Sequence, residues 1–177
     1  QYITISSTGN ATDFGDLVGT IRQLNQGIIS SSTRGVFAGG FNPTMSSVIQ
    51  NVTMASQGNA IDYGDLLQTT RLQASASDSI RGVCFYGYSN PGYENTIEQF
   101  NIASGGQSVD TGGDTTVTSG GGSGVSNSHG GLNDGYQGTR IAPIPQGVGA
   151  GQRGIFAKGG GENLTFVTIS TTGNAND

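Results

Sequence analysis

Residues 2–17 read YITISSTGNATDFGDL and residues 51–66 read NVTMASQGNAIDYGDL, so this phrase returns after 49 positions. Its first half returns again at residues 167–175 as VTISTTGNA, and a degraded copy begins at Asn101. Self-similarity at a period of about 20–50 residues is the signature of a repeat architecture. The chain is therefore predicted to be a repeat protein.

A second phrase alternates with the first. It reads RGVFAGG at residues 34–40, RGVCFYG at 81–87 and RGIFAKG at 153–159. Its short, continuous apolar run is typical of a strand that is buried on both faces. In the first phrase, apolar residues alternate with Thr, which indicates a strand with one buried face. No segment has an apolar stripe with helical spacing, so the prediction is an all-β chain.

Two strands in each phrase predict four-stranded units of about 49 residues, the size of a β-propeller blade. The prediction is one repeat domain, 1–177, with a half unit at 1–21, full units at 22–70 and 71–139, and an incomplete unit at 140–177. The Gly-rich stretch 115–139 is expected to be an inserted loop. About three and a half units do not close a ring alone, so they would belong to a larger or oligomeric propeller. A β-prism-like repeat of three sheets is the alternative.

The order of these signals is similar to the kelch repeat. Arg22, Arg71 and Arg140 precede the units, and the apolar strands end in or near a double Gly, although the Trp typical of that family is absent. The sequence of the first phrase, followed by TRGVFAGG at residues 33–40, also resembles repeats of tail-fibre-like and other virion proteins of marine bacteriophages, including those that infect cyanobacteria. This second resemblance covers residues 1–114 and 140–177. It implies a viral structural or host-recognition role.

Composition argues against several classes of function. Only 11% of the residues are charged, the net charge is −5 and Lys158 is the single lysine, so nucleic-acid binding is not expected. The sequence contains no run of 18 consecutive apolar residues, so a membrane-spanning helix is not expected. The single cysteine, Cys84, stands in the repeat position of Phe37 and Phe156, where a packed, buried side chain is expected.

Enzymatic chemistry lacks the necessary residues. The only histidine, His129, lies in a Gly- and Ser-rich stretch without a second histidine or a cysteine beside it. No nucleophile, base and orienting group can be assembled, so the prediction is a non-enzymatic protein without a cofactor.

Acidic, basic and glycine positions recur with the units. The acidic pairs Asp13/Asp16 and Asp62/Asp65 are weak candidates for calcium ligands, and the alternative is that they cap turns. The repeated arginines are expected to pair with the repeated Asp residues of neighbouring units, with a sulfate or sugar-acid site as the alternative. The positions assigned to the structural repeat are Arg34, Arg81, Arg153, Gly40, Gly87 and Gly159.

Loops that differ between the units are the candidate ligand-binding regions, because Tyr and Asn side chains can stack on sugars and hydrogen-bond to them. The candidate residues are Asn90, Tyr93, Asn133, Asp134 and Tyr136. The expected function is a tail-fibre or virion-surface component that recognises host glycans through these loops. Its expected partners are other copies of itself, other virion proteins and host glycans. The alternative is a secreted or surface-bound bacterial adhesin or self-assembling fibre subunit.

Overall fold

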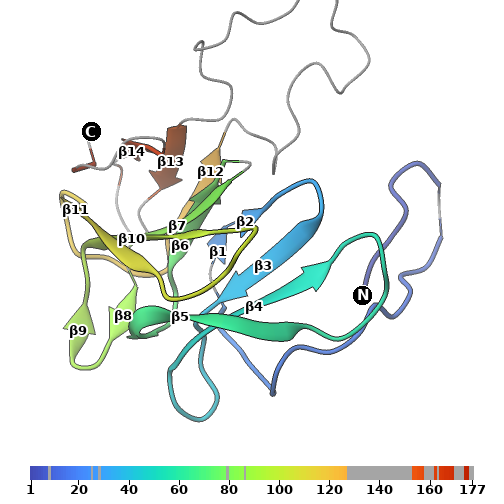
Figure 1. Cartoon of the computed structure of the whole chain (residues 1–177). Helices are drawn as coiled ribbons and strands as arrows, with labels where there is room; N and C mark the ends of the chain where they lie inside the picture. Colours follow the sequence, from blue (N-terminus) through green and yellow to red (C-terminus); the bar gives the residue numbers. More distant parts are fainter. Residues whose placement is uncertain are drawn as a thin grey trace, which may run out of the picture.

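The computed structural model shows an all-β chain (Figure 1). It describes residues 1–7, 9–24, 26–27, 29–78, 80–85, 87–126, 153–157, 162, 164–169 and 174–175. Across these residues, antiparallel pairing groups the strands into sheets of two to four strands, and one short strand that pairs in parallel joins two of these sheets into an eight-stranded sheet. The predicted all-β class is confirmed. No helix that could cross a membrane occurs in the described ranges.

Sheet 1 is a four-stranded meander near the N-terminus. Its strands, in spatial order, are β2 (Ile29–Ser30), β3 (Arg34–Ala38), β4 (Ser46–Thr53) and β5 (Ile61–Thr70). Each strand pairs antiparallel with the next along the chain. The apolar residues of the second repeated phrase thus lie in β3, and the first phrase forms the end of β4 and the start of β5.

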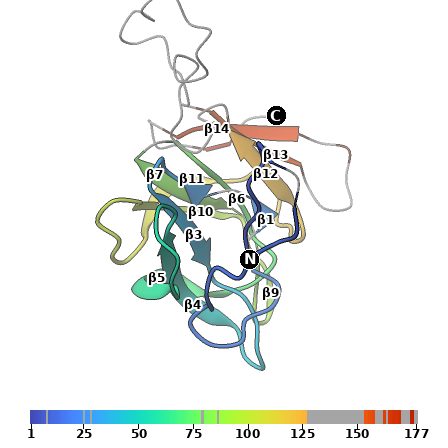
Figure 2. The same cartoon turned by 90° about the vertical axis from the view of Figure 1, so that its right-hand side faces the viewer.

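Sheet 2 repeats this order with a small hairpin added. Its strands are β6 (Ala74–Ser77), β7 (Arg81–Phe85), β10 (Thr96–Asn101) and β11 (Val109–Asp114). The hairpin of β8 (Tyr88–Ser89) and β9 (Gly92–Tyr93) lies between β7 and β10 in the sequence. Sheet 2 lies between the other two large sheets in both views (Figures 1 and 2).

Sheet 3 consists of β12 (Ser123–Ser126), β13 (Arg153–Ala157) and β14 (Leu164–Thr168). The short β1 (Gln26–Gly27) pairs in parallel with β6 and β12, so it connects sheets 2 and 3 edge to edge.

Strand β12 corrects the prediction that residues 115–139 form a loop. Ser123–Ser126 is the first strand of sheet 3 and follows β6 by 49 positions. Sheet 3 therefore begins before the boundary predicted at residue 140. Arg81 follows Ser77 by four positions, whereas Arg153 follows Ser126 by 27, so the extra length lies between β12 and β13.

The same pair of facing residues recurs in three copies of the first phrase. Asn51 faces Ile61 in sheet 1, and Gln99 faces Val109 in sheet 2. In the N-terminal segment, an isolated antiparallel bridge joins Tyr2 to Thr12, each 49 positions before its counterpart in sheet 1. Residues 1–21 thus retain the pairing of the unit's last two strands. We call these residues the N-terminal half-unit.

The hydrophobic core is divided into two clusters, and each cluster joins two consecutive sheets. The sheet 1–sheet 2 cluster contains Ile29, Val36, Ala38, Ile49, Leu66, Cys84, Phe100 and Ile102. The sheet 2–sheet 3 cluster contains Ala74, Ala76, Val83, Phe85, Ile97, Phe156, Val167, Ile169 and Ala175. Burial of apolar surface in both clusters stabilises the stacking of successive sheets.

The first strands of the sheets are connected by a row of equivalent serines. Ser77 Oγ donates to the Ser30 carbonyl oxygen at 3.2 Å, and Ser126 Oγ donates to the Ser77 carbonyl oxygen at 2.5 Å. Small side chains allow these strands to approach one another closely. The described residues do not form a closed propeller: sheets 1, 2 and 3 follow one another, and sheets 1 and 3 lie at opposite ends (Figure 1).

Candidate functional site

The junction between consecutive units is the site to which both repeated phrases contribute. At each junction, a turn of one unit lies against the segment between the two repeated Asp residues of the unit before it, and the turn residues are Asn59–Ala60, Gln107–Ser108 or Asn174–Ala175. The last amide of the turn donates to the carbonyl of the second Asp. These bonds join Ala60 to Asp16 at 2.8 Å, Ser108 to Asp65 at 2.8 Å and Ala175 to Asp114 at 3.0 Å.

The Asn side chain of the same turn adds a second bond. The Asp16 amide donates to Asn59 Oδ1 at 3.0 Å, and the Asp114 amide donates to Asn174 Oδ1 at 3.0 Å. At the sheet 1–sheet 2 junction the equivalent residue is Gln107, which donates from Nε2 to the Leu66 carbonyl oxygen at 3.2 Å. The repeated Asn therefore connects units as well as standing in a turn.

The glycine of the Asp-aromatic-Gly-Asp segment is required by the close approach of the next turn. A Cβ atom at Gly15 would lie 2.3 Å from the Gly58 carbonyl oxygen, and one at Gly64 would lie 2.0 Å from the Gly106 carbonyl oxygen. Backbone atoms at these distances exclude any side chain.

A buried polar side chain on the third strand of each full sheet accepts a bond from the preceding unit. The Val18 amide donates to Gln50 Oε1 at 2.7 Å, and the Leu67 amide donates to Glu98 Oε2 at 2.9 Å. Ser108 Oγ also donates to Glu98 Oε2. Burial raises the pKa of the Glu98 carboxyl and the nearby Asp110 raises it further, although these two bonds partly oppose the shift.

Two repeated arginines connect each sheet to the next. Arg34 Nη1 donates to the Ile102 carbonyl oxygen at 2.9 Å and to the Ala103 carbonyl oxygen. Arg81 Nη1 donates to the Ile169 carbonyl oxygen at 3.0 Å. The acceptors are backbone carbonyls, not the Asp carboxylates suggested by the sequence. The third residue of the series, Arg153, lies over the Phe166 ring within sheet 3, at 5.5 Å from its centroid.

The repeated glycines of the second phrase bind within their own units. The Gly40 amide donates to the Thr70 carbonyl oxygen at 2.8 Å, and the Gly87 amide donates to the Ser119 carbonyl oxygen at 2.9 Å. Gly159 lies outside the described residues.

The acidic pairs contribute mainly to turns and junctions. Asp62 Oδ1 accepts the Gly64 amide at 3.3 Å, and Asp65 Oδ1 accepts Ser47 Oγ at 2.9 Å. Asp13 and Asp16 are exposed in the N-terminal half-unit. Within the part of the chain that the structure describes, no group of three or more His, Cys, Asp or Glu side chains is placed to hold a metal ion.

The β8–β9 hairpin carries two of the five candidate ligand-binding residues. Asn90 lies at its tip, and Tyr93 is 54% exposed and packs edge to face on Tyr88, with ring centroids 5.3 Å apart. The Arg71 guanidinium lies 5.0 Å from the Tyr88 ring centroid and 4.8 Å from that of Phe41. The other three candidates, Asn133, Asp134 and Tyr136, lie outside the described residues.

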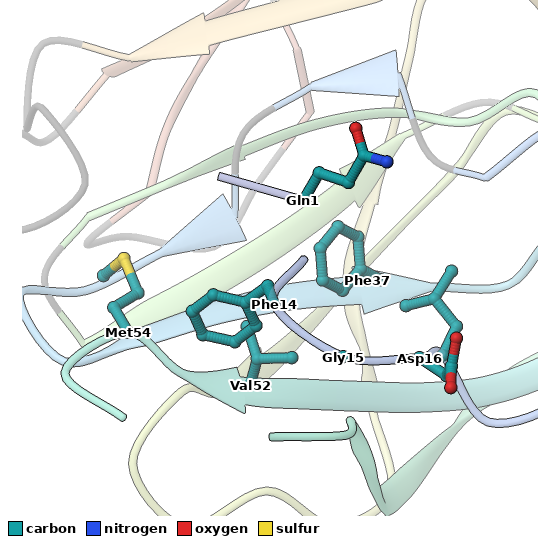
Figure 3. A pocket seen from close by; sticks show the side chains of 8 residues that line it. Gln1, Phe14, Gly15, Asp16, Phe37, Val52 and Met54 are labelled. Carbon is teal, nitrogen blue, oxygen red and sulfur yellow. The ribbon is translucent and has the colours of Figure 1, made fainter. Parts of the chain in front are cut away.

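A pocket of about 390 Å³ opens where the N-terminal half-unit meets sheet 1 (Figure 3). It is lined by Gln1, Phe14, Gly15, Asp16, Leu17, Phe37, Val52 and Met54. The rings of Phe14 and Phe37 and the Met54 side chain border the same space in the close-up view. The lining is therefore largely apolar.

Sequence reasoning missed the junction residues Gln50, Glu98, Asn59 and Asn174. Their signal was available, because Gln50 and Glu98 stand 48 positions apart and both asparagines belong to the repeated phrase. No protein-family model and no curated protein matches the chain.

Proposed function

We propose that this chain is a non-enzymatic structural protein of a virus particle, a component of a tail fibre or of the virion surface, whose sheets are kelch-like blades. The blade interpretation is supported by the division of the core into two clusters, one between each pair of consecutive sheets. A β-prism would instead place its three sheets around one shared core.

The observation that carries the proposal is the recurrence of the same junction bond at three successive junctions. Contacts between neighbouring repeats make the stability of a repeat protein approximately a sum of unit and junction terms. Such a scaffold can hold loops at fixed positions. The buried residues of the repeated phrases serve this packing and leave the variable loops for recognition.

Host-glycan recognition is assigned to the β8–β9 hairpin. Tyr93 presents an exposed aromatic face, and Asn90 offers amide donor and acceptor groups at the tip of the hairpin. Stacking of Arg71 on Tyr88 supports the base of this hairpin. Exposed aromatic and amide groups on a supported loop suit the apolar face and the hydroxyl groups of a sugar.

Location is tested by immunogold electron microscopy of purified phage particles with an antibody raised against the chain. Gold on the tail fibres or on the particle surface is expected, with pre-immune serum as the control. Gold confined to bacterial surface filaments would contradict the proposal.

Glycan recognition is tested separately on an array of host-surface glycans. The variant Tyr93→Ala is expected to lose about tenfold or more in binding, whereas Tyr2→Ala, which alters a tyrosine far from the hairpin in the sequence, retains it. Equal glycan binding by both variants would show that the β8–β9 hairpin does not bind the glycan.

A further inference from the structure

The two ends of the sheet series carry opposite faces of one repeated interface. Within the chain, the face that each sheet turns towards the next one in sequence includes four equivalent apolar positions. In sheet 1 these are Ile29, Val36, Ala38 and Ile49, and in sheet 2 they are Ala76, Val83, Phe85 and Ile97. All eight side chains are buried, with at most 4% of their surface exposed.

The same four positions of sheet 3 are exposed. The strand pairing of sheet 3 identifies these positions as Val125, Ile155, Ala157 and Leu164. Val125 is 60% exposed, Ile155 43% and Leu164 63%. We call these four residues the leading face. A row of exposed apolar side chains on a sheet is a site for pairing with another chain.

The opposite face of the interface is only partly covered at the other end, where Phe37 and Val52 are half-buried and Met54 is exposed. In the sheet 1–sheet 2 cluster, the next sheet contributes Cys84, Phe100 and Ile102, each at most 4% exposed. The equivalent positions of sheet 1 are Phe37, Val52 and Met54. These three side chains line the pocket beside the N-terminal half-unit (Figure 3). We call them the trailing face.

We propose that a second copy of this chain places its leading face on the trailing face, so that copies associate head to tail. The internal junctions support this pairing, because residues at the equivalent positions already make this contact twice, between sheets 1 and 2 and between sheets 2 and 3. In this proposal, sheet 3 of the second copy occupies the pocket. The interface is heterologous, so a pair of copies still has one free leading face and one free trailing face. Further copies can add there, and the series grows into a ring or a filament.

The N-terminal half-unit supplies the strand that sheet 3 lacks among the described residues. Its residues 12–18 correspond to the start of β5 and remain in place to pair with the incoming β14. Residues 3–5 correspond to residues 167–169 of the incoming copy, which displace them. That displacement breaks little, because the described backbone bonds of residues 1–7 are the Tyr2–Thr12 bridge and a Ser7–Thr4 turn, and Ile5 is 94% exposed.

Sedimentation velocity of the full chain over about 1–100 µM tests the proposal. The wild type is expected to form assemblies larger than a monomer. Ile155→Asp on the leading face, or Val52→Asp on the trailing face, raises the concentration needed for half-assembly by about tenfold or more, because a carboxylate would be buried unpaired. Val109→Asp is the matched control, since Val109 is 53% exposed and its counterpart in the N-terminal half-unit is Thr12. Far-UV circular dichroism establishes that each variant is folded.

Mixing the two face variants gives the decisive result. Ile155→Asp retains a trailing face and Val52→Asp retains a leading face, so an equimolar mixture forms heterodimers that cannot grow further. A wild type that stays monomeric at 100 µM, face variants that assemble like the control, or a mixture that stays monomeric would each overturn the proposal. The outcome does not depend on the virion role, because it concerns the chain in solution.

Discussion

Arg34 of sheet 1 donates from Nη1 to the carbonyl oxygen of Ile102, directly after β10 in sheet 2, across 2.9 Å. The Arg81–Ile169 bond has the same form one junction later. A guanidinium thus closes the end of a strand in the neighbouring sheet, where the carbonyls have no further strand residues to bind. These two bonds join residues that lie 68 and 88 positions apart in the sequence.

Arg34→Ala is expected to lower the free energy of unfolding by about 1.5–3 kcal/mol, the usual range for hydrogen bonds that involve a charged group. Urea denaturation followed by circular dichroism measures the loss. Arg22→Ala is the control, because it removes the same charge and leaves the backbone bridge between residue 22 and Phe41 in place. It should change the free energy of unfolding by only about 0.5 kcal/mol. Equal losses in both variants would show that net charge, not the junction bond, determines the effect.

Gly64→Ala is expected to destabilise the protein by about 1–3 kcal/mol, since the added methyl group meets the Gly106 carbonyl oxygen at 2.0 Å. Gly92→Ala adds the same methyl group at a position with no heavy atom within 4 Å and should be close to neutral. The melting temperatures of the two variants provide the comparison. A Gly64→Ala variant as stable as the wild type would mean that the turn of sheet 2 does not lie on β5 in solution.

Glu98→Gln is expected to flatten the pH dependence of stability. The folded state raises the pKa of Glu98 above its ordinary value of 4.5, so the folded protein binds the proton more tightly than the unfolded chain. Stability from this group is therefore present at low pH and is lost as pH rises from 4.5 through the folded pKa. The amide has no charge to bury and still offers an acceptor to the Leu67 amide.

Thermal unfolding across this pH range measures the effect. The wild type loses stability as the pH rises, and Glu98→Gln is more stable than the wild type at the upper end. Glu162→Gln, which alters an exposed side chain, is the charge-matched control. An unchanged slope in Glu98→Gln would contradict the assignment.

Cys84 is expected to resist thiol reagents in the folded protein. The side chain is 1% exposed, and burial raises the pKa of its thiol well above the ordinary value, with the nearby Glu98 adding to the shift. Because the thiolate is the reactive form, labelling should follow opening of the sheet 1–sheet 2 junction. The rate of reaction with an aromatic disulfide reagent should rise in Arg34→Ala and stay low in Arg22→Ala. Rapid labelling of the wild type would show that this junction opens readily.

The strands of the second phrase could be predicted because their signal is local. Phe37, Cys84 and Phe156 occupy one register position and face the equivalent residues Gln50, Glu98 and Thr165 on the next strand. Their burial differs because burial depends on the neighbouring unit: Phe37 lines a pocket, whereas Phe156 is fully buried.

The junction partners and β12 could not be predicted in the same way. An alternating apolar pattern indicates which face of a strand is buried, but not which distant backbone group lies against it. Arg34 therefore suggested an acidic partner, although its acceptors are carbonyl oxygens. Ser123–Ser126 has the composition of a linker and is ordered by pairing with β13 and by the serine row. In the sequence, only the alignment of these residues with β6 distinguishes this strand from a linker.

The constant spacing of the facing pairs Tyr2–Thr12, Asn51–Ile61 and Gln99–Val109 has a genetic consequence. Unequal crossing-over between two copies of the repeat in the gene would delete or duplicate one whole period in frame. The backbone junction bond in the altered protein would still find its usual type of partner. Lineages could therefore change the length of this protein by single recombination events, without compensating mutations in the units that remain.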